Sequence, residues 1–365
     1  MSDPRATGGE ARPEAPASEI ISAAAERGAL VMESISVSKD FRIGRGHVLH
    51  AVRDVSFGLY RGAVVALVGE SGSGKSTTAM LLAGQERLTS GSIRLDGRPV
   101  DLATRAAFRR YKSDVQLVFQ DPFASLNPVH TVRYHLERPV RLHQHKRSAG
   151  DLDAEIDALL EQVRLTPAAQ YIDKYPHELS GGQRQRVSFA RALAARPRVL
   201  LADEPVSMLD VSIRLEMLNL LDDLRQRFQL ALLYITHDIA SARYFADEVL
   251  VMYAGQVIER GPAEAVTQQP AHPYTQLLVA SAPDPDNLGG ALRGGISENG
   301  RKASATSAAT IGCPFSPRCP LAVDRCRIDV PPMQPFGTSR SAACWRLDVA
   351  APELTGAAQG GVDMD

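Results

Sequence analysis

Long apolar runs are missing from this chain of 365 residues. No hydrophobic stretch approaches the length of about 18 residues that a membrane-spanning helix needs. The chain begins Met-Ser-Asp-Pro and lacks the basic start and apolar core of a secretory signal. These absences predict a cytoplasmic protein, which can still act at a membrane by docking on a partner that spans it.

Neither sign of charge is in excess. The chain has 41 basic and 42 acidic residues and a net charge of −1. Proteins that bind nucleic acid carry a basic surface, so the composition predicts no nucleic-acid partner. The hydrophobic content of 44% is enough to fill one large domain or two modest ones.

Cysteine is absent from residues 1–312, and all four cysteines lie close together after them: Cys313, Cys319, Cys326 and Cys344. Disulfides are disfavoured in the cytoplasm, so four clustered thiols predict a metal centre. Tetrahedral zinc and an iron–sulfur cluster both suit four thiolates. Zinc sites more often use closely spaced pairs, which are missing here, and longer gaps let the chain wrap a larger cluster. Unliganded or adventitiously paired thiols are the third interpretation.

A phosphate-binding loop is the most informative feature that is present. Residues 69–77 read GESGSGKST and fit the pattern G-x-x-x-x-G-K-[ST], between a strand-like run at 63–68 and a predicted helix at 78–83. The glycines let backbone N–H groups turn toward anionic oxygens at a helix N-terminus. We expect Lys75 to reach the β- and γ-phosphates and Ser76 to help hold Mg²⁺. The predicted nucleotide contacts are Gly69, Ser71, Gly72, Ser73, Gly74, Lys75, Ser76 and Thr77.

Polar side chains follow three further predicted strands, at residues 115–119, 199–202 and 230–236. Ligands bind at the carboxyl ends of strands in open α/β sheets. Gln120 is therefore a candidate to ligate Mg²⁺ or orient a water, and Asp203 is a candidate to hold the metal. Glu204 is the candidate general base. His237 is placed to hydrogen-bond the γ-phosphate.

A second anion site is predicted where Leu179 to Gln183 lead into a helix. Ser180 is a good N-cap, and Gly181 and Gly182 leave backbone N–H groups uncovered. Two anion sites with one nucleotide predict a head-to-tail dimer with two nucleotides between the protomers. Asp210 then lies at the contact between protomers. Phe41 precedes the phosphate loop and is suited either to stacking on an adenine or to the core.

The chain divides into four predicted parts. Residues 1–28 are rich in Ala, Pro, Glu, Ser and Gly and predict disorder. Residues 29–265 form the nucleotide domain, with strands near 30–37, 48–59 and 91–97, a helical insertion at about 122–190, a helix at 151–163 and a closing hairpin at 249–261. Residues 266–350 form an extension that contains a mobile linker at 286–311 and the cysteines between 313 and 344. Residues 351–365 predict an unstructured tail.

Over about residues 30–345, this set of motifs in this order resembles the ATP-binding subunit of an ABC transporter. The resemblance implies an α/β fold with a RecA-like core, a β-subdomain, an inserted helical subdomain and a small cysteine-rich extension. It implies ATP and Mg²⁺ as ligands and hydrolysis at a dimer interface. Phe41 would stack on adenine, Gln120 would be the Q-loop, Leu179 to Gln183 would be the signature and His237 would be the switch histidine. Met208 departs from the family, which usually has a small residue there.

Six segments narrow the resemblance to the ATPases of oligopeptide and dipeptide importers: residues 120–128, 204–207, 210–213, 272–275, 282–285 and 312–320. The similarity is closer to the F than to the D subunit of the pair. It implies uptake of di- and oligopeptides at the cytoplasmic face of the membrane. The partners would be a second ABC ATPase subunit, two membrane permeases and an extracytoplasmic peptide-binding protein. It also implies a 4Fe-4S cluster on Cys313, Cys319, Cys326 and Cys344.

Three alternatives remain at this point. The transported solute is nickel or glutathione instead of a peptide. The chain is a soluble ABC ATPase that acts on ribosomes or DNA, although it has one set of motifs and no sustained heptads for a long coiled coil. Lastly, the chain is a redox sensor with vestigial hydrolysis, which the intact Glu204 and His237 disfavour.

Overall fold

The computed structural model describes residues 28–44, 47–144, 148–281, 311–337 and 339–355. The predictions of disorder for residues 1–28 and of a mobile linker at 286–311 lie almost wholly outside these residues. The same holds for most of the predicted unstructured tail.

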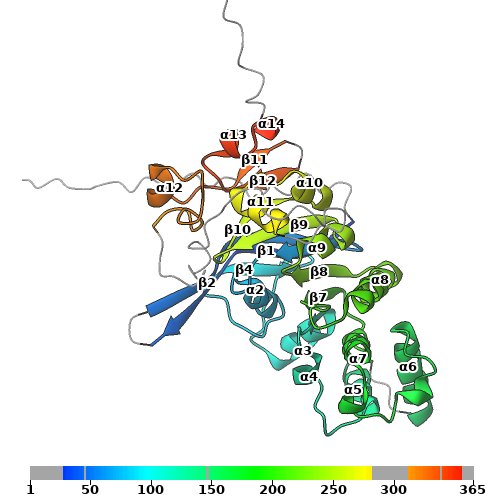
Figure 1. Ribbon diagram of the computed structural model, residues 1–365. Helices are drawn as coiled ribbons and strands as arrows, with labels where there is room; N and C mark the ends of the chain where they lie inside the picture. The colour runs from blue at the N-terminus through cyan, green and yellow to red at the C-terminus, as the bar shows by residue number, and fades with distance from the viewer. Residues whose placement is uncertain (1–27, 45–46, 145–147, 282–310, 338, 356–365) are drawn as a thin grey trace, which may run out of the picture.

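A sheet of eight strands runs through the molecule (Figure 1). Its strands, from one edge to the other, are β11 (Gln334–Phe336), β12 (Arg340–Ala342), β10 (Gln256–Pro262), β9 (Glu248–Tyr253), β3 (Val64–Val68), β8 (Ala231–Thr236), β7 (Val199–Asp203) and β6 (Val115–Val118). The strands from β9 to β6 are parallel, and the other three pair antiparallel. The carboxyl ends of the parallel strands therefore meet at one edge, as predicted for the polar residues that follow them.

Each face of this sheet has its own hydrophobic core. In β3, Val65 and Leu67 pack into the core that contains buried residues of β1 and α2. Val64 and Val68 point to the other face and join the core of α7, α8 and α9. Successive side chains of a strand alternate between faces, so a strand covered on both sides reads as a continuous apolar run. The helices named here are α2 (Lys75–Leu82), α7 (Gly181–Leu193), α8 (Val211–Phe228) and α9 (Ile239–Phe245).

A second sheet has the order β2 (His47–Tyr60), β1 (Leu30–Ile43), β4 (Ser90–Leu95), β5 (Arg98–Pro99), and its neighbouring strands are antiparallel. The strands expected near 30–37, 48–59 and 91–97 are all present. Asp96 and Gly97 both have positive φ, 50° and 72°, which matches the two-residue turns of tight hairpins. The chain then enters α3 (Arg105–Asp114), whose N-cap Thr104 accepts a hydrogen bond from the Ala107 N–H.

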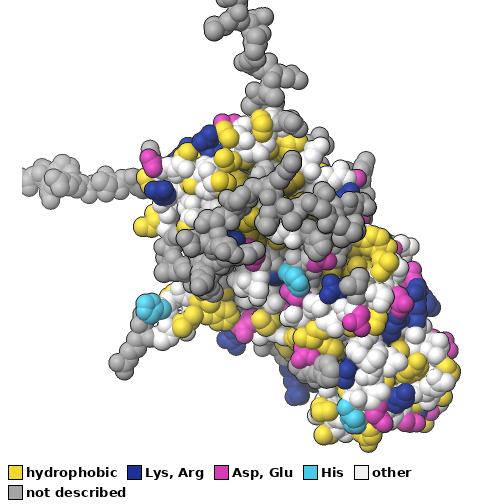
Figure 2. Space-filling view, viewed as in Figure 1, with side chains coloured by type: hydrophobic (Ala, Val, Ile, Leu, Met, Phe, Trp, Pro, Cys, Tyr) yellow, Lys and Arg dark blue, Asp and Glu magenta, His cyan; other side chains and the backbone are white. Residues whose placement is uncertain are grey.

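Between β6 and β7 the chain is helical, and in Figure 1 these helices lie at the opposite end of the molecule from the C-terminal elements. We call residues 122–193 the helical segment. Its elements are α4 (Pro122–Ser125), α5 (Val132–Pro139), a π-helical turn (Val140–Gln144), α6 (Ala149–Gln162), 3₁₀ turns (Ala168–Gln170 and Pro176–Glu178) and α7. The helix expected at 151–163 is α6, which begins two residues earlier because Ser148 caps it by accepting from the Asp151 N–H. On the face visible in Figure 2, basic and acidic side chains are interspersed over this segment.

The hairpin expected at residues 249–261 is formed by β9 and β10, and the sheet continues beyond it. β12 pairs with β10, with Glu259 opposite Ala342, and β11 extends the sheet further. An edge strand presents unpaired N–H and C=O groups, and here residues from the extension cover them. Strands of three residues are too short to show alternation, so no pattern in the sequence predicts them.

The remaining C-terminal elements pack around these two strands. They are α10 (Ala263–Gln268), α11 (Pro273–Ala280), α12 (Asp324–Ile328), α13 (Leu347–Ala350) and α14 (Pro352–Thr355). Ala351 is buried and α14 follows it, so the structured chain continues a few residues into the tail that was expected to be unfolded. Residues 263–355 are called the C-terminal segment below.

A buried ion pair connects the C-terminal segment to the sheet. The Glu259 carboxylate on β10 receives the Arg340 guanidinium at 3.0 Å and the N–H groups of Ala271 and His272 at 2.9 and 2.8 Å. Both side chains of the pair are almost inaccessible to solvent. A buried charge is tolerated only when it is paired and hydrogen-bonded, so these contacts make the register of β12 specific.

The segment 272–275, one of the marks of the peptide-importer resemblance, forms the start of α11. His272 caps the helix through Nδ1, which accepts the Tyr274 N–H at 3.0 Å, and Pro273 occupies the first turn. Burial lowers the pKa of His272 to about 3, so its ring is neutral and free to accept.

Of the helices in the described part of the chain, none combines the length and hydropathy that a bilayer crossing requires.

Candidate nucleotide site

A cavity of about 710 Å³ opens where the carboxyl ends of the parallel strands meet. The phosphate loop forms one wall, from Glu70 to Thr77. The other lining residues include four that were predicted from the sequence: Phe41, Gln120, Glu204 and His237. The structure thus brings together residues from five distant stretches of the chain.

The glycines of the phosphate loop are required by close backbone contacts. A Cβ atom on Gly69 would lie 2.2 Å from the Met252 carbonyl oxygen, and one on Gly74 would lie 2.3 Å from that of Ala51. Gly74 also has φ +105°, which side chains rarely adopt. The loop can therefore take this path only with glycine at both positions.

The loop ends at the N-terminus of α2, where Gly74 provides no side-chain cap. The first N–H groups of a helix have no partner within the helix, so those of Lys75, Ser76 and Thr77 are available to an anion. Lys75 donates to the carbonyl oxygens of Gly69 and Glu70 at 2.8 and 2.9 Å, and burial lowers its pKa. This environment fits a phosphate group.

The predicted magnesium ligands Ser76 and Asp203 are in contact. The Ser76 hydroxyl donates to Oδ1 of Asp203 at 3.1 Å, at the end of β7. Burial raises the pKa of Asp203, and the Ser76 hydrogen bond opposes that rise. Hydroxyl and carboxylate oxygens are ligands that Mg²⁺ prefers, so this pair fits the metal expected with the nucleotide.

Glu204 is the centre of the polar cluster. Its Oε2 accepts from Nε2 of Gln120 at 2.9 Å and lies 3.1 Å from Nδ1 of His237. Glu204 also has φ +45°, a conformation that is uncommon outside glycine and that concentrates at functional sites. Its N–H is held by the Ile235 carbonyl at 2.9 Å. Side chains from the ends of β6, β7 and β8 therefore converge on one carboxylate.

Phe41 is half-buried on β1 and lines the cavity, and it does not belong to either hydrophobic core of the central sheet. The Lys39 ammonium lies 4.7 Å from the centre of its ring. The Phe41 ring thus lies in the wall of the cavity, as the prediction that it stacks on adenine requires.

The residues of the second predicted anion site lie apart from the nucleotide cavity of their own chain. Among the described residues that line the nucleotide cavity are neither Ser180–Gln183 nor Asp210. Ser180 caps α7 as predicted, because its hydroxyl accepts the Gln183 N–H and Gln183 Oε1 accepts the Ser180 N–H. The N–H groups of Gly181 and Gly182 remain for an anion. Asp210 precedes α8 and makes no side-chain cap.

Two residues that border the phosphate loop were missed by the sequence analysis. The Arg318 guanidinium binds the Glu70 carboxylate, and the Tyr274 hydroxyl accepts the Glu70 N–H at 2.9 Å. Both belong to segments that were noted only as marks of the resemblance, with no role attached. No local pattern could connect Arg318 to a residue that precedes it by 248 positions.

The four thiols line one small cavity together with His272, Phe315 and Trp345. The Cys313 N–H donates to the Cys326 carbonyl at 2.8 Å, and the Arg346 N–H donates to Sγ of Cys344 at 3.3 Å. Burial raises the pKa of Cys313 and Cys319, and that of Cys344 to about 11. Within the described residues, no group of three or more His, Cys, Asp or Glu side chains is arranged to hold a single metal ion.

Comparison with known proteins gives two family matches. Residues 52–207 match the ABC transporter family, and residues 258–326 match the C-terminal region of oligopeptide/dipeptide transporters. The first match covers the phosphate loop, Gln120 and Glu204. The second covers the start of the C-terminal segment and three of the four cysteines.

Individual relatives agree. The Pseudomonas aeruginosa di/tripeptide transport ATP-binding protein DppF is 39% identical over 326 residues, which are 86% of this chain and 98% of that protein. Sinorhizobium fredii y4tS, named as a probable peptide ABC transporter ATP-binding protein, is 41% identical over 84% of this chain and 86% of its own length. Among solved structures, the dimeric ATP-binding cassette MJ0796 bound to ADP and Pi is similar with a TM-score of 0.58 and 27% identity, over 64% of this chain and 98% of that one. The chain therefore belongs to the ATP-binding proteins of ABC transporters, in the group that carries the oligopeptide/dipeptide transporter C-terminal region.

Proposed function

We propose that this chain is the ATP-hydrolysing subunit that powers uptake of di- and oligopeptides, at the cytoplasmic face of a membrane importer. The observation that carries the proposal is that Gln120 and His237 both contact Glu204, beside the phosphate loop and the N-terminus of α2, which no side chain caps. The family match supports the ATPase role, and the names of the relatives support the peptide solute.

In this mechanism the chain's own groups bind and orient the triphosphate. The first N–H groups of α2 and the Lys75 ammonium bind phosphate oxygens, while Phe41 stacks on the base. Mg²⁺, held by Ser76 and Asp203, would neutralise charge on the phosphates. Glu204 accepts the proton of the attacking water, with Gln120 orienting that water and His237 donating to the γ-phosphate.

The signature residues complete the pocket of a second protomer. Ser180 to Gln183 supply backbone N–H groups but do not line their own chain's cavity. In a head-to-tail dimer, these N–H groups would bind the γ-phosphate of the nucleotide held by the partner chain. Asp210 and the exposed Met208 would lie at the contact between the two chains. We infer that the partner is a second, related ATPase chain, which makes the pair a heterodimer.

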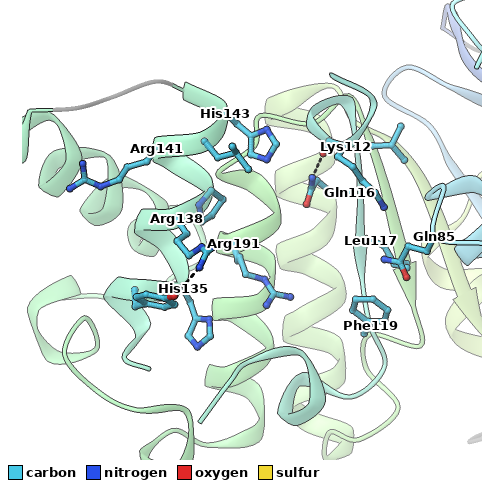
Figure 3. Close-up of a pocket in the computed structure, with 14 residues that line it drawn as sticks. Gln85, Lys112, Gln116, Leu117, Phe119, His135, Arg138, Arg141, His143 and Arg191 are labelled. Atoms are coloured by element: carbon cyan, nitrogen blue, oxygen red, sulfur yellow. Dashed lines mark hydrogen bonds between the residues drawn. The ribbon is translucent and has the colours of Figure 1, made fainter. Parts of the chain in front are cut away.

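A cavity of about 770 Å³ lies between the helical segment and the end of β6 (Figure 3). We infer that a cytoplasmic loop of a permease subunit docks there. Lys112, Arg138 and Arg191 line it along with the apolar Phe119 and Leu142, and no carboxylate does so among the described residues. This chemistry fits a loop with acidic and apolar side chains. Phe119 lines this docking cavity, and the next residue, Gln120, lines the nucleotide cavity. A displacement of Phe119 by the permease loop would therefore also move Gln120 in the hydrolytic site.

Reconstitution with two permeases, the partner ATPase and the peptide-binding protein tests this function. We expect di- and oligopeptides to stimulate ATP hydrolysis. Leu142→Asp should remove that stimulation and leave basal hydrolysis intact, because it places a charge in the docking cavity. Val349→Asp is the matched control, since Leu142 and Val349 are similarly exposed, at 52% and 43%, and Val349 lies on α13 far from this cavity.

Other outcomes would redirect the proposal. Stimulation by nickel or glutathione but not by peptides would keep the transporter and change its solute. Co-purification with ribosomes or DNA instead of membranes would contradict the transporter itself.

We further propose that Cys313, Cys319, Cys326 and Cys344 hold a 4Fe-4S cluster with a structural or regulatory role. The four thiols line one cavity, which supports a centre shared by all four, and their spacing in the sequence lacks the close pairs that zinc sites more often use. The thiols must lose their protons to bind the cluster, and burial raises the pKa of Cys313, Cys319 and Cys344. Binding of the cluster should therefore become stronger as pH rises. Anaerobic analysis should find iron and sulfide, whereas stoichiometric zinc with little iron would reject the cluster.

A further inference from the structure

The C-terminal segment reaches the phosphate loop through one charged contact. Nη1 of Arg318 lies 2.9 Å from Oε2 of Glu70, and Nη2 lies 3.0 Å from Oε1. Two parallel N–H···O bonds of this kind are stronger and more directional than a single contact, and only arginine presents the planar fork that makes them. Glu70 is the second residue of the phosphate loop, and Arg318 lies in the thiol loop, the residues between Cys313 and Cys319.

The arginine is held in place by aromatic rings. Its guanidinium lies 5.8 Å from the ring centre of Tyr253 and 5.7 Å from that of Phe315. Tyr253, Tyr274 and Phe315 also contact one another, with ring centres 4.6 to 5.5 Å apart. The Arg318 side chain is only 16% exposed. The hydrogen bonds to Glu70 raise the pKa of Arg318 above the usual value of an arginine. Packing against these rings therefore fixes Arg318 in position, unlike the flexible side chains of an exposed ion pair.

Every polar group of Glu70 has a partner in this arrangement. Its carboxylate binds Arg318, its N–H donates to the Tyr274 hydroxyl, and its carbonyl oxygen accepts from the Lys75 ammonium at 2.9 Å. The first two partners come from the C-terminal segment. Arg318 also neutralises a carboxylate that would otherwise lie unpaired beside the site for a highly charged anion, where it would repel the anion.

We propose that Arg318, assisted by Tyr274, is a positioning residue for the phosphate loop, so that the C-terminal segment sets the affinity of the site for nucleotide. This inference rests on the proposed nucleotide site but not on the transported solute. It gives the thiol loop a direct connection to ATP binding: a change in the conformation of residues 313–319 moves the group that holds Glu70.

The test is nucleotide affinity in four variants of the full chain: Arg318→Ala, Arg318→Lys, Glu70→Gln and the double variant Arg318→Ala/Glu70→Gln. We expect Arg318→Ala to weaken ATP and ADP binding by about 10-fold, the effect of one charge-assisted hydrogen bond. In the assembled transporter it should raise KM for ATP and leave kcat nearly unchanged. Arg318→Lys keeps the charge without the fork and should give an intermediate loss.

The double variant separates positioning from a purely structural role. When residue 70 is already neutral, removing Arg318 should cost much less affinity than it does in the parent chain. Arg327→Ala is the matched control and should bind as the parent does, because Arg327 is an exposed arginine of the same segment. Unchanged affinity in Arg318→Ala, or an equal loss in both backgrounds, would overturn the proposal. A failed peptide assay with these binding effects intact would contradict only the proposed solute.

Discussion

Glu204→Gln should slow ATP hydrolysis by about 10²- to 10⁴-fold, the usual contribution of a positioned general base. Glutamine keeps the size of the side chain and can still accept from Gln120 and pair with His237, so the geometry around residue 204 should survive. What it loses is the carboxylate that takes the proton of the attacking water. ATP should still bind, and the ATP-bound dimer should therefore accumulate. Single-turnover hydrolysis together with size-exclusion chromatography in ATP and Mg²⁺ would measure both effects.

The control for this variant is Glu264→Gln, which removes a carboxylate from the first turn of α10, away from the nucleotide cavity. It should hydrolyse ATP at the parent rate and form no trapped dimer. Parent-like hydrolysis by Glu204→Gln itself would show that another group acts as the base.

Lys75→Ala should weaken ATP binding by about 10- to 150-fold, because it removes at least one hydrogen bond between an ammonium group and a charged phosphate. Lys75 is buried at the start of α2 and now satisfies the carbonyl oxygens of Gly69 and Glu70. An anion in the loop offers the ammonium a stronger partner than those carbonyls. Equilibrium binding of ATP, followed by fluorescence or calorimetry, gives the loss directly.

Lys174→Ala is the comparison for this effect, since Lys174 contacts the Tyr171 ring in the helical segment and does not line the nucleotide cavity. Its affinity for ATP should equal that of the parent. Thermal unfolding without nucleotide should show that Lys75→Ala is folded. Parent-like affinity in a folded Lys75→Ala chain would contradict the assignment of this loop.

The sequence was informative wherever chemistry or burial constrains several neighbouring residues at once. The apolar runs that became β3, β7 and β8 are continuous because both faces of the sheet are covered. Glu204 and His237 could be recognised as site residues because each directly follows one of these strands. Strand order was not needed for that prediction, since all parallel strands end at the same edge.

The parts that escaped prediction depend on contacts between distant residues. β11 and β12 are three residues long and are strands only because β10 offers an open edge. The Arg318–Glu70 pair depends on how the C-terminal segment folds back across the sheet, and neither residue carries a local signal for the other. The even mixture of charge in the sequence likewise concealed the basic lining of the docking cavity.

The shared sheet has a consequence for the modularity of this chain. Because β12 continues the sheet that begins with the ATPase strands, the boundary near residue 265 divides the sequence but not the folded unit. A chain shortened at that boundary would expose the edge of β10 and remove Arg340 and the Ala271 and His272 N–H groups, which now bind the Glu259 carboxylate. Loss or exchange of the C-terminal segment would therefore disturb the catalytic core as well, because the two parts share one sheet.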